Sequence, residues 1–164
     1  TDMWSGSFKL DGQATYQTEA ITALFEDTAR DENGEFGEPE WVGRLWLTYD
    51  LNDWSFFWGM NYVDAVSNLE RYGGDPTATY RGEEVGVVVD ADAVLYHSLS
   101  VTKFFFDSDL RAVVGVRNLL DEDPPQVTKL NLGANMSTSG SVAGPYSQYD
   151  YYGRTFYLSL SYDF

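Results

Sequence analysis

The chain has no cysteine and few basic residues, with 10 Lys and Arg against 26 Asp and Glu, so its net charge is −16. Without cysteine there is no disulfide framework, and thiols give no indication of the redox compartment. So acidic a chain has no basic stripe to neutralise phosphates, which excludes nucleic acid as a partner. A run of about 18 apolar residues, as a membrane-spanning helix requires, is also missing.

Catalytic motifs are equally scarce. The sequence contains no phosphate-binding loop, no cluster of metal ligands and no nucleophilic triad, so we expect neither an enzyme nor a bound cofactor. The single histidine, His97, has Ser98 and Ser100 nearby, which raises the possibility of a Ser-His hydrolase. Residues an odd number of positions apart on a strand point to opposite faces, so we expect His97 to be separated from both serines.

One acidic segment has part of the spacing of a calcium loop. Asp31, Asn33, Gly34 and Glu40 stand at its third, fifth, sixth and twelfth places, and such oxygen ligands suit a hard cation. The first place is Ala29, and no helical pattern flanks the segment. We therefore predict no metal site but a solvated acidic loop, or one that contacts lipopolysaccharide through bridging cations.

Aromatic residues make up 16% of the chain, and alternating apolar and polar positions are clearest in residues 153–164. This period of two predicts a strand. A terminal Phe would be unfavourable in water, but it suits the aromatic girdle of an outer-membrane barrel. We therefore expect a closing strand whose apolar face serves as a C-terminal assembly signal. That signal comprises Leu158, Leu160, Tyr162 and Phe164.

Five further strands are predicted upstream, at about residues 7–20, 41–49, 54–63, 93–105 and 110–117. Between them, tight turns at residues 50–53 and 106–109 alternate with long polar connections. The long connections cover residues 25–40, 64–92 and 118–152. Transmembrane barrels alternate short periplasmic turns with long extracellular loops, so we expect the long connections to lie outside the cell.

Six strands do not close a membrane barrel, because single-chain examples start at about eight. The chain opens Thr-Asp-Met-Trp, without a basic or apolar leader, so an exported precursor would begin earlier. The predicted fold class is all-β. We expect residues 1–164 to be the C-terminal portion of a larger antiparallel transmembrane β-barrel domain.

Alternation also predicts the strand register. Around the turn at 106–109, Phe105 pairs with Leu110, Val101 with Val114 and Leu99 with Val116. Around the turn at 50–53, Arg44 lies beside Gly59 or Asn61, and Trp46 beside Phe57 or Gly59. The polar face then lines the lumen, where water or acidic partners can satisfy the arginines. The candidate lumen-facing residues are Arg44, Arg111, Arg117 and Asp11.

Two segments near the end carry a family resemblance. Residues 113–125 read Val-Val-Gly-Val-Arg-Asn-Leu-Leu-Asp-Glu-Asp-Pro-Pro, and a Gly-Arg step precedes the last strand. This pattern resembles the carboxyl end of TonB-dependent outer-membrane receptors, although Leu120 stands where that family often has Phe. The matching positions are Gly115, Asn118, Leu119, Asp121, Pro124, Pro125, Gly153 and Arg154.

The resemblance implies a barrel of about 22 strands, filled by a plug domain that this chain does not contain. It implies a location in the bacterial outer membrane and import of a scarce nutrient, such as siderophore-bound iron, a vitamin or an oligosaccharide. The implied partners are outer-membrane lipid and lipopolysaccharide, the barrel assembly machinery, the rest of the barrel and plug, and, through the plug, the inner-membrane TonB complex.

Two other classes remain open at this point. One is a porin-like outer-membrane channel without a plug. The other is a soluble extracellular β-sandwich that binds carbohydrate on the aromatic-rich hairpin at residues 41–63. Alternation places the hairpin's rings on the predicted lipid face, which favours girdle residues over a sugar-stacking platform.

Overall fold

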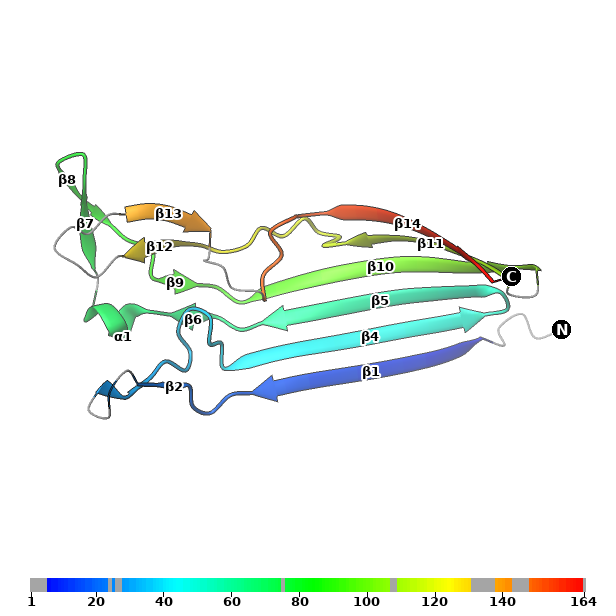
Figure 1. The fold of residues 1–164 in the computed structure, drawn as a ribbon, viewed down its shortest axis with the longest axis horizontal. Helices are drawn as coiled ribbons and strands as arrows, with labels where there is room; N and C mark the ends of the chain where they lie inside the picture. Colours follow the sequence, from blue (N-terminus) through cyan, green and yellow to red (C-terminus); the bar gives the residue numbers. More distant parts are fainter. Residues whose placement is uncertain are drawn as a thin grey trace.

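The computed structural model describes residues 6–23, 25, 28–74, 76–106, 109–130, 138–142 and 148–163. Its main element is one antiparallel sheet of six long strands that lie side by side in chain order (Figure 1). They are β1 (Ser7–Tyr16), β4 (Trp41–Leu51), β5 (Trp54–Val63), β10 (Val94–Phe105), β11 (Leu110–Arg117) and β14 (Thr155–Tyr162). The all-β class with antiparallel sheets is confirmed.

The six predicted strands are all present, with small differences at their ends. β1 stops at Tyr16 rather than at residue 20. Beyond it, the Ala20 backbone N–H donates to Asp31 Oδ1 at 2.9 Å, away from the ladder with β4. β14 begins at Thr155 and ends at Tyr162, and Phe164 lies outside the described residues.

The predicted hairpin registers are confirmed. Phe105 lies opposite Leu110, Val101 opposite Val114 and Leu99 opposite Val116. In the other hairpin, Arg44 lies opposite Asn61 and Trp46 opposite Gly59, which selects one of the two predicted alternatives. A slip of one residue would exchange the faces of a whole strand, so these pairings establish which side chains share each face.

One face of the sheet is apolar and exposed. Phe8, Leu158 and Phe156 expose 71%, 67% and 76% of their surface. The polar exceptions on this face include His97, whose ring stacks on Trp58 at 5.7 Å between centroids. Patches this extensive are rare on soluble monomers. Its exposed large side chains are Phe8, Leu10, Tyr16, Trp41, Trp54, Phe56, Leu95, Leu99, Phe105, Val114, Phe156, Leu158, Leu160 and Tyr162.

The buried core lies at one end of the sheet rather than behind its centre. It forms where the long connections pack against the ends of β5 and β10, and Phe36 packs against it from the first connection. The six-stranded sheet therefore has only a small core, and β1 and β14 are its open edges within the described part of the chain. The core residues are Val63, Val66, Ala91, Val94, Tyr96, Val127 and Tyr149.

The long connections contain short elements that alternation did not predict, because a strand of two to five residues is too short to show a period. These elements lie at one end of the sheet, opposite the tight turns (Figure 1). No helix in the described part of the chain is long and apolar enough to cross a membrane. The elements are β2 (Ile21–Thr22), β3 (Arg30–Asp31), β6 (Val66–Ser67), α1 (Leu69–Tyr72), β7 (Thr77–Tyr80), β8 (Glu83–Gly86), β9 (Asp90–Ala91), β12 (Gln126–Leu130) and β13 (Thr138–Val142).

A buried carboxylate joins the first two long connections. Glu35 is only 8% exposed and forms ion pairs with Arg30 and, at 3.3 Å, with Arg71. The backbone N–H of Phe36 also donates to Asn68 Oδ1 at 2.9 Å. Because these contacts link residues far apart in the sequence, the two connections are held together as one unit.

Candidate functional site

A row of polar side chains crosses four neighbouring strands near their loop end. Gln13 lies opposite Arg44, Arg44 opposite Asn61, and Asn61 opposite Tyr96. Residues directly opposite each other project from the same face of a sheet. The register therefore gathers side chains from β1, β4, β5 and β10 at one level of the polar face.

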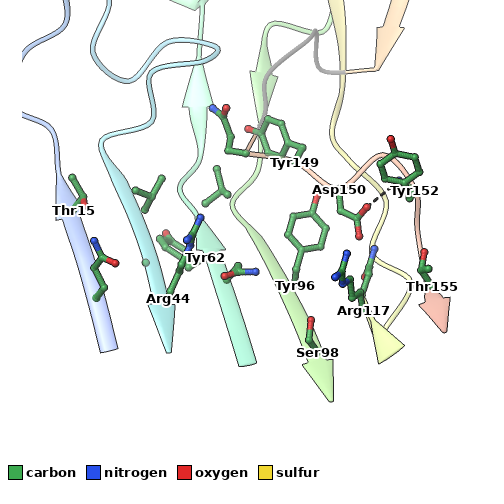
Figure 2. Close-up of a pocket in the computed structure, with 17 residues that line it drawn as sticks. Thr15, Arg44, Tyr62, Tyr96, Ser98, Arg117, Tyr149, Asp150, Tyr152 and Thr155 are labelled. Carbon is green, nitrogen blue, oxygen red and sulfur yellow. Dashed lines mark hydrogen bonds between the residues drawn. The ribbon is translucent and has the colours of Figure 1, made fainter. Parts of the chain in front are cut away.

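The row lines a cavity of about 780 Å³, a size that accommodates a small-molecule ligand. Its other side is lined by Gln148, Tyr149, Asp150 and Tyr152. Tyr149, which is 6% exposed, also belongs to the core. Figure 2 shows Tyr149 and Asp150 beside the strand residues Tyr96 and Arg117. The lining residues are Gln13, Thr15, Val42, Gly43, Arg44, Asn61, Tyr62, Val63, Tyr96, Ser98, Arg117, Asn118, Gln148, Tyr149, Asp150, Tyr152 and Thr155.

The four predicted lumen residues lie on this polar face but are not all in the same site. Arg44 and Arg117 line the large cavity, whereas Arg111 lines a second cavity of about 400 Å³. Asp11 forms its ion pair with Lys9 at 3.0 Å. Among the described residues, no ion pair joins Asp11 to an arginine.

The family-motif residues form a corner where β11 ends. Asn118 is 2% exposed and has a φ of 49°, a left-handed conformation that Asn tolerates better than most residues. Its Nδ2 donates to the Glu122 carbonyl at 2.9 Å, and its Oδ1 accepts the Glu122 N–H at 2.8 Å. The Leu119 N–H donates to the His97 carbonyl at 2.7 Å, which ties the corner to β10.

A second group of motif residues joins this corner to the start of β14 by hydrogen bonds. The Arg154 backbone N–H donates to Asp121 Oδ1 at 2.8 Å, and its guanidinium donates to Oδ2 at 3.1 Å. Gly153, between the loop and Arg154, has a φ of 68°, which glycine adopts readily. Motif positions more than 30 residues apart therefore meet in one contact.

We expect the contact between Asp121 and Arg154 to lose its stabilising effect in acid. The backbone N–H of Arg154, with its guanidinium, lowers the pKa of Asp121 below the ordinary value of 3.8. A lowered folded-state pKa contributes stability above pH 3.8, and that contribution is lost as pH falls through the lowered pKa. The loss of stability between pH 5 and pH 2, followed by urea unfolding, should be smaller in Asp121→Asn than in the natural chain. Equal acid sensitivity in both would contradict this role.

The other motif residues have steric or boundary roles. Gly115 lies opposite Tyr157 on the polar face, and a Cβ at position 115 would overlap the Tyr157 ring. The Arg117 guanidinium lies 5.5 Å from the centre of that ring. Pro124 and Pro125 follow the corner and precede β12, where the missing N–H groups of proline suit an irregular segment.

Leu158, Leu160 and Tyr162, three residues of the predicted C-terminal signal, lie on the exposed apolar face. They lie opposite Val114, Ala112 and Leu110 of β11, which share that face. Phe164, the fourth member of the predicted signal, is outside the described residues.

The partial calcium loop is organised by hydrogen bonds to its own backbone. Asp31 Oδ1 accepts the N–H groups of Ala20 and Asn33, which lowers the pKa of Asp31. Asn33 Nδ2 donates to the Gln17 carbonyl at 3.1 Å. Within the described part of the chain, no three His, Cys, Asp or Glu side chains are grouped to hold a metal ion.

Sequence patterning did not predict the contribution of residues 148–152 to the cavity. The run Gln-Tyr-Asp-Tyr-Tyr has no strand period, and Tyr149 meets Val94 and Tyr96 of β10 only in the folded core. Comparisons with protein-family models, curated proteins and solved structures find no match for this chain. Its function is therefore inferred from its own residues and their geometry.

Proposed function

We propose that the chain is part of the barrel wall of a TonB-dependent outer-membrane transporter that imports a scarce nutrient. The observation that carries the proposal is the sheet's exposed apolar face, on which Leu10, Leu158 and Leu160 are each at least 65% exposed. Hydrocarbon is the environment in which such a face is stable without a protein partner. A polar opposite face then lines the lumen.

The open sheet edges support a larger barrel. Backbone groups on the outer sides of β1 and β14 have no strand partner among the described residues. An unpaired edge is unfavourable in lipid, because no water is present to satisfy its N–H and C=O groups. Further strands from the rest of the protein would pair with both edges and close the wall.

The motif corner favours a TonB-dependent receptor over a porin-like channel. The resemblance includes both the Asn118 corner and the Gly153-Arg154 step, and these two segments contact one another through Asp121. A soluble carbohydrate-binding sandwich would require a second sheet over the apolar face. Among the described residues, the other sheets are two-stranded and lie in the long connections.

The proposal includes partners outside this chain. Lipid and lipopolysaccharide would contact the apolar face, the assembly machinery would insert the barrel, and an upstream plug would receive energy from the inner-membrane TonB complex. Transport would then require that complex, whereas passive diffusion through a porin would not.

Cysteine labelling tests the orientation, since this chain supplies no cysteine of its own. We expect Glu84→Cys, in exposed β8, to react with a membrane-impermeant maleimide on intact cells. Asp109→Cys, in the turn between β10 and β11, should react only after the outer membrane is permeabilised. Labelling of Asp109→Cys but not Glu84→Cys on intact cells would reverse the orientation, and recovery of the protein in the soluble fraction would refute the membrane location.

A further inference from the structure

We propose that the cavity under residues 148–152 binds a small organic molecule carrying at least two carboxylate groups. This inference rests on the proposed function, because it takes the polar face as a lumen open to the outside. It adds a substrate class, which the family resemblance does not specify.

The first argument is an imbalance of charge. Although the chain has a net charge of −16, the cavity is lined by two guanidinium groups, Arg44 and Arg117, and by one carboxylate, Asp150. Elsewhere most cations pair with acids, as Lys103 does with Asp53 at 3.1 Å. Within the described residues neither cavity arginine forms an ion pair, so no carboxylate there neutralises either charge, although the Arg117 guanidinium lies over the Tyr157 ring.

The second argument is one buried hydrogen-bond donor without a partner in the described part of the chain. Gln148 Nε2 is buried and has no hydrogen-bond partner among the described residues, and it belongs to the cavity lining. Asp150 Oδ1 accepts the Tyr152 backbone N–H at 2.9 Å, so part of the carboxylate's accepting capacity is already used. A ligand rich in acceptor oxygens would therefore complement the lining.

The spacing of the two arginines indicates two anionic groups rather than one. Arg44 is on β4 and Arg117 on β11, with β5 and β10 between them. Neighbouring strands are about 4.8 Å apart, so three strand spacings place the two Cα atoms about 14 Å apart across the sheet. Arg117 is also about two residues off the level of Arg44 along the strands, which makes the full separation larger. When both arginine side chains extend toward each other over β5 and β10, one dicarboxylate can pair with both guanidinium groups. Each pair is then a charge-assisted hydrogen bond.

The net charge of the chain also bears on how the ligand would be held. A strongly acidic protein does not attract anions from a distance. The affinity must then come from short-range pairing in the cavity, and it should depend strongly on each arginine.

Titration calorimetry on the full-length protein in detergent tests the proposal, with glutarate as the probe and uncharged glutaramide as its neutral counterpart. We expect glutarate to bind and glutaramide not to bind. Arg44→Gln and Arg117→Gln should each weaken glutarate binding about tenfold, the equivalent of one charge-assisted hydrogen bond. Asp150→Asn should strengthen it, because the substitution removes the carboxylate that repels the anion.

Arg111→Gln is the matched control, since it makes the same change on the same face but in the second cavity. Its glutarate affinity should equal that of the natural protein. Equal binding of glutarate and glutaramide, or unchanged affinity in both cavity variants, would overturn the proposal. A lower urea midpoint in Arg44→Gln and Arg117→Gln, with unchanged glutarate binding, would also overturn the proposal. The two arginines would then pair with an acidic segment of the protein itself.

The transporter proposal and the dicarboxylate proposal would be refuted by different measurements. Recovery of the protein outside the outer membrane would refute the transporter, while calorimetry on the purified protein would still report on the cavity. Absence of glutarate binding by a correctly inserted, heat-modifiable barrel would refute only the dicarboxylate site.

Discussion

Leu158→Asp should remove most of the folded protein from the outer membrane. Leu158 is 67% exposed on the apolar face, opposite Val114 of β11. In a lipid-facing wall, the change removes a leucine from hydrocarbon, at about 1.5 to 3 kcal/mol, and adds the cost of a carboxylate. We expect the free energy of unfolding to fall by about 3 kcal/mol, measured by urea unfolding in lipid vesicles, together with loss of the heat-modifiable band.

Ser159→Asp is the matched control. It introduces the same carboxylate one residue further along the strand, on the polar face, where Ser159 and Arg111 line the same cavity. We expect nearly natural abundance and stability for this variant. The pair also tests whether the apolar face meets lipid or water, because a substitution at an exposed site in water changes stability by about 0.5 kcal/mol or less. A stable, abundant Leu158→Asp protein would therefore contradict the barrel.

Asn118→Ala should have the second largest effect, through the corner at the end of β11. The substitution removes both side-chain hydrogen bonds between Asn118 and Glu122. It also places an alanine at a position that is buried, with Asn118 2% exposed, and that has a left-handed backbone conformation. Each lost hydrogen bond costs about 0.5 to 1.5 kcal/mol, and alanine tolerates a left-handed conformation about 1 kcal/mol less well than asparagine. We expect a destabilisation of about 3 kcal/mol, measured as a lower midpoint in urea unfolding.

Asn52→Ala provides the control for backbone strain. Asn52 has a similar φ of 53° in the turn between β4 and β5, but it is exposed. Its replacement should change the free energy of unfolding by no more than about 1 kcal/mol. Equal effects at both positions would mean that backbone conformation, rather than the hydrogen bonds of Asn118, stabilises the corner.

The strands, their faces and the hairpin registers follow from the sequence because they depend on local information. Apolar and polar residues alternate along all six strands, and a tight turn brings consecutive strands together. The pairing of Val101 with Val114 is therefore a consequence of alternation and turn length. Loop length likewise predicted that the long connections gather at one end of the sheet, and the structure places them there (Figure 1).

The short elements in the connections were beyond sequence patterning. β6 and β9 pair Val66 with Ala91 across an intervening helix and hairpin. Each strand has only two residues, so neither shows a period. Their pairing is stabilised by the core at the end of the sheet, where Val66 and Ala91 pack with Val94.

The candidate site likewise has a part that the sequence predicted and a part that only the tertiary structure decided. Alternation placed Arg44, Arg111 and Arg117 on one face and left Gly59 or Asn61 as the neighbour of Arg44, and the structure has Asn61 there. Only the tertiary structure brought residues 148–152 over that row, separated Arg111 into another cavity and joined Asp121 to Arg154. The reason is physical: period and turn chemistry act over a few residues, whereas the return of a long connection is decided by which distant side chains it can bury. Here the buried Tyr149 anchors that return within the core.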